Sequence, residues 1–429
     1  MERRPLQPIP TSSRSGPNIN WSWASRRNTD LMSGMGVSPM EKDPQDIENT
    51  PQEQVKKLTP PAKREAPKEK DDKFVLARRP RFSMNKKSAT SMSWHLIPDE
   101  LLLNAFSYLH LTDLLRVSRV CKKWYRLSLD ESLWYSLDMC GSHVADGVLG
   151  KLLPCGVVVF RCPRTSIGEP MFKDVRSIRL QHVDLSNCSL STDSLQSILS
   201  RCYKLQNLTL EGVKISDDVM RSLAQNPDLF RLNLSGCSGF SPYTLATLLK
   251  NCTKLKGFNL SWCYFTADHV QATIQNLPSS LTELNLCGYR QHVALQDVET
   301  IVTRCPNLII LDLSDSILLT ADCFTALKRL HHLQDLGLSR CYQLTTAEIL
   351  DFGKTSNLKA LMVFGLVTDD AFQLLTEALP HIMINSTTFT TVARPTPGPN
   401  KSSRDIWGIK CKLTRQCTEA LCTAHDSQP

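Results

Sequence analysis

One repeated pattern constrains this chain of 429 residues more than any other feature. The pattern L-x-x-L-x-L recurs as LQNLTL (205–210), LFRLNL (229–234), LKGFNL (255–260), LTELNL (281–286), LIILDL (308–313) and LQDLGL (333–338), with LKALMV (358–363) as a variant. The last apolar residues of successive copies are 24 to 27 residues apart. HVDLSNC (182–188) fits one period earlier, and weaker copies are VVVFRC (157–162) and WYSLDMC (134–140). A period of this length indicates a solenoid whose units pack only against their neighbours.

The second half of each repeat has the pattern of an amphipathic helix. Apolar residues fall at i, i+3, i+4 and i+7 in three repeats: Leu195, Ile198, Leu199 and Cys202; Leu245, Leu248, Leu249 and Cys252; Val298, Ile301, Val302 and Cys305. Ser241-Pro242 supplies a cap and a first-turn proline for one of these helices. The sequence therefore predicts an α/β fold, a leucine-rich-repeat horseshoe over 137–384 with about ten repeats of a short parallel strand and an outer helix, the first ones irregular.

The sixteen cysteines do not read as a disulfide framework or a metal site. The N-terminus MERRPLQPIP has no apolar signal region and no segment is apolar enough to cross a membrane, so we expect reduced thiols in the cytoplasm and nucleus. Several cysteines follow the predicted strands or end the predicted helices, and none lies in a C-x-x-C pair. We expect them in the core, with no bound metal and no cofactor.

Residues 1–92 differ from the rest in charge and composition. They hold 11 of the 24 prolines, 18 of the 50 Lys and Arg, and 11 of the 42 Asp and Glu. Such a segment buries too little apolar surface to fold, so we expect a disordered regulatory tail, in which Ser38-Pro39 is a candidate phosphorylation site. Because the basic excess lies in this tail rather than on a folded face, the sequence does not favour nucleic-acid binding.

Residues 93–136 predict a small helical module. Pro98-Asp99-Glu100 precedes an apolar helix, with the acidic residues at its positive end. A second helix, capped by Thr112-Asp113, would carry one apolar stripe: Val117, Val120, Cys121 and Trp124. About forty residues cannot build an adequate core alone, so this module needs a neighbour.

A column of surface positions follows the predicted strands. In a strand that reads Leu-x-Leu, the leucines point inward and the alternate residues point to the concave face. We expect the position two beyond the last apolar residue to lie on that face; the column reads Asn187, Gly212, Gly236, Trp262, Gly288, Asp315, Arg340 and Gly365. An exposed Trp262 beside charges favours an interface anchor. Asp315 and Arg340 are equally compatible with binding a partner and with pairing with each other.

After Asn385 the repeats stop, and residues 385–429 have the composition of a tail. Ile406-Trp407-Gly408-Ile409 is an apolar patch that a disordered segment seldom keeps, so we expect it to dock on the solenoid. It could cap the open end or lie across the concave face. Neither the tail nor the repeats contain a phosphate-binding glycine loop, a zinc-protease motif or a serine-nucleophile motif, so nothing in the sequence suggests catalysis.

The helical module resembles a known motif along nearly its whole length. Ile97-Pro98-Asp99-Glu100-Leu101-Leu102, Val120-Cys121-Lys122-Lys123-Trp124 and Ser132-Leu133-Trp134 are similar to an F-box, and cysteine-containing leucine-rich repeats follow it. The chain thus resembles the family of F-box and leucine-rich-repeat proteins. The resemblance implies that the module binds S-phase kinase-associated protein 1, the adaptor that links to a cullin and its ring-finger subunit. It assigns these residues to the adaptor interface: Pro98, Glu100, Leu101, Phe106, Leu109, Leu114, Val120, Cys121 and Trp124.

The same resemblance implies a non-catalytic substrate receptor of an SCF ubiquitin ligase. Such a receptor directs phosphorylated inhibitors of cyclin-dependent kinases to proteasomal degradation at the G1/S transition. Trp262, Arg290, Asp315, Arg340 and Trp407 match positions that meet a Cks-type accessory subunit and the phosphorylated inhibitor, and the segment around Leu31–Ser38 resembles a cyclin A contact. The alternative is a repeat scaffold or inhibitor that takes no part in ubiquitin transfer.

Overall fold

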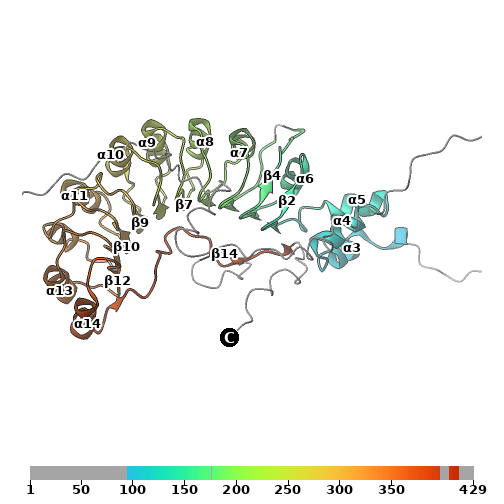
Figure 1. Ribbon diagram of the computed structural model, residues 1–429. Helices are drawn as coiled ribbons and strands as arrows, with labels where there is room; N and C mark the ends of the chain where they lie inside the picture. The colour runs from blue at the N-terminus through green and yellow to red at the C-terminus, as the bar shows by residue number, and fades with distance from the viewer. Residues whose placement is uncertain (1–93, 175, 397–404, 415–429) are drawn as a thin grey trace, which may run out of the picture. The chain divides into compact units, whose positions relative to one another are not determined.

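The computed structural model describes residues 94–174, 176–396 and 405–414. The candidate phosphorylation site Ser38 and the predicted cyclin A segment lie outside these residues. The described part contains a short helical module followed by the repeat array (Figure 1). None of its helices is long and apolar enough to cross a bilayer.

The repeats build one sheet of 12 strands, and all of its neighbouring pairs are parallel. Each strand lies beside the strand of the adjacent repeat with its central apolar residue opposite that of the neighbour, as in the register of Leu208 with Leu232 and of Leu232 with Phe258. The strands, in their order across the sheet, are β13 (Met383–Ile384), β12 (Ala360–Met362), β11 (Asp335–Gly337), β10 (Ile310–Asp312), β9 (Glu283–Asn285), β8 (Gly257–Asn259), β7 (Arg231–Asn233), β6 (Asn207–Thr209), β5 (His182–Asp184), β3 (Val159–Arg161), β1 (Ser136–Asp138) and β16 (Leu413–Thr414). The predicted α/β leucine-rich-repeat fold is therefore confirmed, including the weak early copies at β1 and β3.

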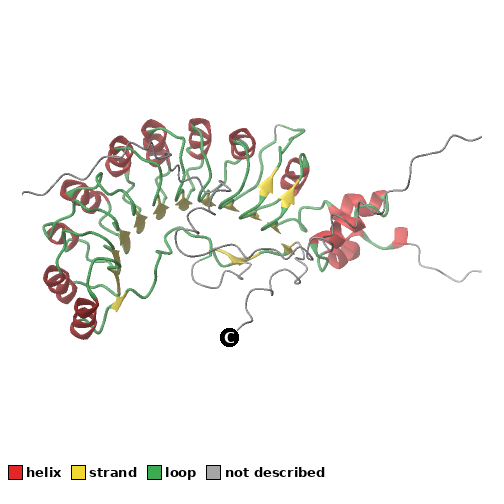
Figure 2. Ribbon diagram, viewed as in Figure 1, coloured by secondary structure: helices red, strands yellow, loops and turns green. Residues whose placement is uncertain are grey.

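The helices lie along the outer, convex side of the curved sheet, and the other side of the sheet forms the concave face (Figure 2). The helices of the array are α6 (Val148–Leu152), η3 (Leu153–Cys155), α7 (Thr192–Leu199), α8 (Asp217–Leu223), α9 (Pro242–Asn251), α10 (Ala267–Asn276), α11 (Leu295–Arg304), α12 (Cys323–Leu327), α13 (Thr346–Thr355) and α14 (Asp369–Ala378). The predicted cap of α9 is confirmed: the Ser241 hydroxyl accepts a hydrogen bond from the Thr244 amide, and Pro242 is the first helical residue. A separate pair, β2 (His143–Val144) and β4 (Ser166–Ile167), lies in the early repeats.

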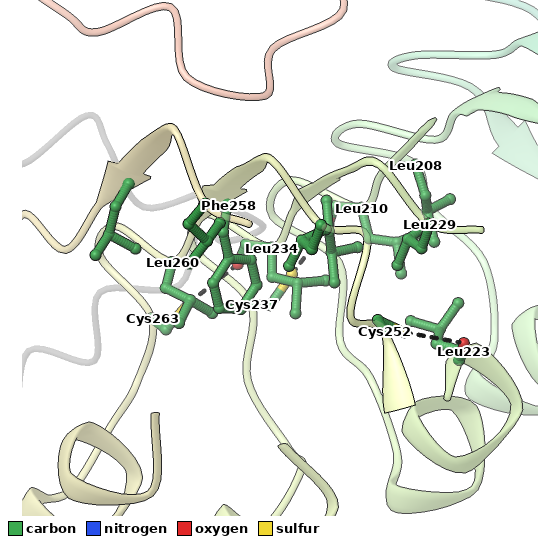
Figure 3. Close-up of a cluster of buried hydrophobic side chains, with 14 of the residues drawn as sticks. Leu208, Leu210, Leu223, Leu229, Leu234, Cys237, Cys252, Phe258, Leu260 and Cys263 are labelled. Atoms are coloured by element: carbon green, nitrogen blue, oxygen red, sulfur yellow. Dashed lines mark hydrogen bonds between the residues drawn. The ribbon is translucent and has the colours of Figure 1, made fainter. Parts of the chain in front are cut away.

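The leucines and cysteines of the pattern form one continuous core between strands and helices (Figure 3). The cysteine that follows a strand donates its thiol hydrogen to the preceding repeat: Cys237 Sγ lies 3.0 Å from the Leu210 carbonyl oxygen, and Cys263 Sγ lies 3.0 Å from that of Leu234. Among the described cysteines none forms a disulfide. A small apolar side chain with one weak donor thus fits a site where a backbone carbonyl needs a partner.

The helical module consists of η2 (Trp94–Leu96), α3 (Asp99–Phe106), α4 (Leu111–Val117) and α5 (Lys122–Ser128). The prediction of one helix carrying a stripe from Val117 to Trp124 was wrong. The helix ends at Val117, and a new one begins after Cys121, whose sulfur accepts a hydrogen bond from the Trp124 amide. The predicted cap at Thr112-Asp113 was also wrong, because α4 begins at Leu111 with His110 as its extended N-cap residue.

The segment after β13 crosses the strand side of the sheet. Asn259 donates a hydrogen bond from Nδ2 to the Val392 carbonyl oxygen at 3.2 Å, and Asn285 Nδ2 lies 2.6 Å from Thr390 Oγ1. Farther on, β14 (Asp405–Ile406) and β15 (Ile409–Lys410) form a hairpin, and β16 pairs with β1 as the edge strand of the same sheet. Of the two sequence-based alternatives, the tail therefore lies across the concave face, and its last described strand also covers one edge.

Candidate functional site

The predicted surface column occupies a turn, not a strand. Each of its eight residues follows its strand and has a positive φ, from 55° at Asn187 to 101° at Gly288. Strand alternation, from which the column was placed on the concave face, therefore does not apply at these positions, because the backbone reverses there. Glycine and asparagine adopt this left-handed conformation most easily, which explains why they fill five of the eight positions.

The last strand residue holds this turn in place. The Asn233, Asn259 and Asn285 side-chain oxygens each accept the backbone N–H two residues on, at 2.9, 3.0 and 2.9 Å. Asp312 does the same with the Ser314 amide at 3.0 Å. An Asn at the end of the strand with glycine three residues later, as in Asn233 with Gly236 and Asn285 with Gly288, was a sequence signal for this turn that the repeat period did not give.

Trp262 and Arg340 are the column residues for which the left-handed backbone is costly, whereas Asp315, like asparagine, adopts it more easily. Such a conformation costs a bulky side chain about 1–2 kcal/mol. Strain of this kind persists where the surroundings impose it, and it concentrates at functional sites. Trp262, Asp315 and Arg340 belong to the turns after β8, β10 and β11, which lie within four neighbouring strands of the sheet.

The side chains of these residues contact one another across the repeats. The Arg340 guanidinium lies 5.6 Å from the centroid of the Trp262 ring, within the range of a cation–π contact. The intervening Gly288 leaves room for that ring: a Cβ there would lie 2.9 Å from Trp262 Cδ2. Trp262 nevertheless remains 51% exposed, so it presents a half-buried aromatic plane to a partner.

Asp315 and Arg340 form a bidentate ion pair. Arg340 Nε lies 2.7 Å from Asp315 Oδ1, and Nη2 lies 2.5 Å from Oδ2. Arg290 approaches the same carboxylate at 4.0 Å. The hydrogen bond to Asp315 raises the pKa of Arg340 despite partial burial. Of the two alternatives left open for these residues, the structure thus shows the pairing with each other. The Asp315 side chain is 1% exposed while that of Arg340 is 42% exposed, so the pair still offers a cation to solvent.

Two exposed aromatic residues that were not selected from the sequence follow the same turns. Tyr264 and Tyr342 are both exposed, and each lies two residues beyond a column residue, Trp262 or Arg340. Their position four residues after the last apolar residue was a readable signal. We name Trp262, Asp315, Arg340, Arg290, Tyr264 and Tyr342 the turn surface.

Trp407 does not join the turn surface. It packs with Ile406 against Val158 and Val159, at the end of the sheet near β3, and its Nε1 is buried without a partner among the described residues. Trp407 and Gly408 both have positive φ and form the tight turn of the β14–β15 hairpin. Four strand spacings, roughly 19 Å, separate β3 from β8 in the sheet, so Trp407 and Trp262 serve different regions.

In the helical module, the predicted adaptor residues divide into core and surface. Phe106 and Leu114 are buried, and Trp124 packs edge-on against Phe106 with ring centroids 5.4 Å apart. By contrast Leu101 and Val120 are 60% and 61% exposed. Leu109 and Cys121 are half-buried, and Pro98 and Glu100 are exposed. Among the large apolar side chains of this predicted set, Leu101 and Val120 are therefore the exposed ones, while Phe106, Leu114 and Trp124 support them from within.

A helical module of this sequence joined to such an array defines the class of F-box and leucine-rich-repeat proteins. An F-box-like family model matches residues 94–140, and a model described as the SKP2 LRR domain matches residues 147–414. The second match spans more than half of the chain, which therefore belongs to the SKP2 LRR domain family. It extends through the segment that crosses the sheet to β16.

Known proteins of this architecture are similar at low identity. The F-box protein SKIP19 of Arabidopsis thaliana is 25% identical over 215 residues, which cover 41% of this chain and 70% of that protein. The F-box/LRR-repeat protein 12 of Homo sapiens is 26% identical over 273 residues, 63% of each chain. The crystal structure of the Rad7 and Elc1 complex in yeast matches with a TM-score of 0.38 and 14% identity over 67% of this chain and 93% of that chain. The F-box and leucine-rich-repeat architecture supports a general role as a substrate receptor of an SCF ubiquitin ligase, a class of typically non-catalytic subunits.

Proposed function

We propose that this chain is the counterpart of SKP2 itself: the subunit that selects phosphorylated cyclin-dependent kinase inhibitors for an SCF ligase, together with a Cks-type accessory subunit. The observation that carries the proposal is the turn surface. At three column positions the chain keeps Trp262, Asp315 and Arg340 in a left-handed backbone that glycine would adopt without strain. These are the positions that the family resemblance assigns to the accessory subunit.

The receptor works by proximity, with no group of its own in the chemistry. The exposed Leu101 and Val120 dock on the adaptor S-phase kinase-associated protein 1, and through it on the cullin and its ring-finger subunit. Holding a substrate lysine near the charged conjugating enzyme makes transfer effectively unimolecular, which is worth many orders of magnitude in effective concentration.

A continuous core makes this positioning rigid. Leu127 and Leu133 of the F-box belong to the same apolar cluster as the repeats. Trp134 is fully buried, and its indole N–H donates to the Ser128 carbonyl oxygen at 2.7 Å. Arg179 forms an ion pair with Glu131 across the junction. A stiff junction keeps the distance between adaptor and substrate fixed, as transfer by proximity requires.

The accessory subunit supplies most of the phosphate pocket, so the turn surface needs an anchor rather than an arginine cluster. Trp262 offers an apolar ring, and the exposed guanidinium of Arg340, held in place by Asp315, offers a positive charge. In the cell we expect the protein in nucleus and cytoplasm, with cyclin A bound through the segment around Leu31–Ser38.

Reconstituted ubiquitination tests the proposal. A phosphorylated kinase inhibitor is incubated with the full chain, adaptor, cullin and ring-finger subunit, with and without the accessory subunit. We expect transfer only when the accessory subunit is present. Trp262→Ala should weaken accessory-subunit binding at least about tenfold. Tyr243→Ala, an exposed aromatic in the helix layer, is the matched control and should leave binding unchanged.

The adaptor side is tested separately. Leu101→Ala with Val120→Ala should abolish co-purification with the adaptor while the repeats stay folded, because both side chains are exposed and neither supports the core. Trp124→Ala would confound this test, since Trp124 packs on Phe106. Undiminished adaptor binding by the double variant, or transfer that ignores the accessory subunit, would reject the corresponding half of the proposal.

A further inference from the structure

A cavity lies between the early repeats and the tail, apart from the turn surface. Its volume is about 670 Å³. Its floor is made by the strand ends and turns after β1, β3, β5 and β6, and its roof by residues 386–391 and 394–396. The turn surface follows β8 to β11, so the cavity belongs to a different part of the concave side.

Three guanidinium groups line this cavity. Arg161 is 8% exposed and pairs with Asp138 through Nη1 at 2.9 Å, but its Nε has no hydrogen-bond partner among the described residues. Arg394 Nε is also buried without a partner in the described chain, although the guanidinium lies 5.7 Å from the centroid of the Phe389 ring. Arg164 is exposed and forms no ion pair with any described residue. A buried donor left unpaired costs about 1–3 kcal/mol, so these donors favour an incoming acceptor.

The acidic residues of the lining are already engaged. Asp184 accepts the Ser186 amide at 3.0 Å, and Glu211 Oε2 accepts a hydrogen bond from Asn233 Nδ2 at 3.1 Å. Burial raises the pKa of Asp184 above its usual value. The cationic groups that remain available are Arg164 and Arg394, together with the unpaired donor of Arg161.

The roof offers hydrogen bonds of a second kind. Residues 386–391 form no regular strand or helix in the structure, and in the described chain their backbone amides have no backbone partner. Unpaired backbone amides of this kind can donate hydrogen bonds to the carbonyl groups of an incoming extended segment. The floor spans three strand spacings, roughly 14 Å, which is about the length of four extended residues.

We infer that this cavity binds a short, extended, acidic segment of the substrate, with Arg164 and Arg394 contacting its carboxylate or phosphate groups and residues 386–391 pairing with its backbone. The inference rests on the proposed function, since it gives the receptor a second contact with its cargo, beyond the turn surface. It assigns the tail a role in recognition, because the roof exists only when residues 386–396 cross the sheet.

Fluorescence anisotropy with synthetic peptides tests the inference on the full chain. Three labelled heptapeptides share glycine and serine ends and carry three central glutamates, three glutamines or a phosphoserine. We expect at least one anionic peptide to bind at least about tenfold more tightly than the glutamine peptide, with affinity that falls as salt rises. If the phosphoserine peptide binds more tightly than the glutamate peptide, phosphate is the preferred group. If the two anionic peptides bind equally, the site accepts either a carboxylate or a phosphate.

Charge-reversal variants locate the site. Arg164→Glu and Arg394→Glu should each weaken the anionic peptide about tenfold or more. Arg221→Glu, an exposed arginine on α8 in the helix layer, is the matched control and should change affinity less than about twofold. No preference for the anionic peptides, or equal losses for all three variants, would overturn the inference.

The same preparations separate this inference from the proposed function. Adaptor binding depends on Leu101 and Val120, which the cavity variants do not touch. Adaptor binding without selective peptide binding would overturn the cavity site alone. Selective peptide binding without adaptor binding would leave the site standing and remove the ligase role.

Discussion

The Asp315–Arg340 pair makes a quantitative prediction about stability, because its two members differ in burial. The carboxylate is 1% exposed and the guanidinium 42% exposed. Arg340→Ala removes both hydrogen bonds and leaves a buried carboxylate with only Arg290 near it, at 4.0 Å. Breaking a buried pair in this way costs about 3–5 kcal/mol, and solvent access through the vacated space reduces the expected loss to about 2–3 kcal/mol.

The reverse truncation should cost less. In Asp315→Asn the side chain keeps its shape and tolerates the left-handed φ of 67°, and Arg340 is free to turn toward solvent. We expect a loss of about 1 kcal/mol. Because asparagine leaves no buried charge behind, adding Asp315→Asn to Arg340→Ala should recover part of the stability that Arg340→Ala loses.

Urea unfolding followed by circular dichroism measures these differences. Arg221→Ala, which breaks the exposed pair with Asp218 at 2.6 Å, is the control and should cost less than about 0.5 kcal/mol. A double variant whose losses simply add, or an Asp315→Asn loss as large as that of Arg340→Ala, would refute the reasoning that the stranded carboxylate dominates.

Three further predictions concern single residues. Burial lowers the pKa of His182, whose Nδ1 accepts a hydrogen bond from Asn207 at 2.8 Å. Because the unfolded chain therefore takes up the proton first, the free energy of unfolding should fall as pH drops below about 6.5. Urea unfolding at about pH 7 and about pH 5 should show this fall, and His182→Gln should make it smaller. Burial raises the pKa of Cys263 to about 12, so at about pH 8 iodoacetamide should alkylate the exposed Cys140 before it alkylates Cys263. Peptide mass spectrometry measures the two alkylation rates, and equal rates would contradict the burial of Cys263. Gly236→Ala should cost about 1 kcal/mol of unfolding free energy through its φ of 68° alone, since the nearest atoms to an added Cβ lie 3.7 Å away, and an unchanged midpoint would contradict it.

The turn column links stability to recognition. Five of its eight positions hold glycine or asparagine, which suit the backbone, and the others hold Trp262, Asp315 and Arg340. The solenoid thus tolerates strain at Trp262 and Arg340, in the turns after β8 and β11, and these turns carry the proposed interface together with Asp315. Trp262→Gly would remove strain and the anchor together, so stability and partner affinity need not change in the same direction.

The repeat array was largely predictable because its information is local. The period placed the strands, the i, i+3, i+4 stripes placed the helices, and Ser241-Pro242 placed a helix start within one residue. Most cysteines of the repeats could be assigned to the core from their spacing, since each repeat buries the same positions against its neighbour, but Cys188 is only half-buried and Cys140 is exposed. The sequence also allowed the pairing of Asp315 with Arg340 to be considered, because residues at equal positions in adjacent repeats lie one strand spacing apart.

What the tertiary structure decided concerns contacts without a period. The Leu-x-Leu pattern predicts which side chains of a strand point inward, but it does not predict where the strand ends. The left-handed turn after each strand was therefore seen only in the φ angles of the structure. The division of the F-box residues into buried Phe106 and exposed Leu101 depended on how three short helices pack. The course of the tail rests on contacts such as Asn259 to Val392, 133 residues apart in sequence, and no local pattern encodes a pairing at that separation.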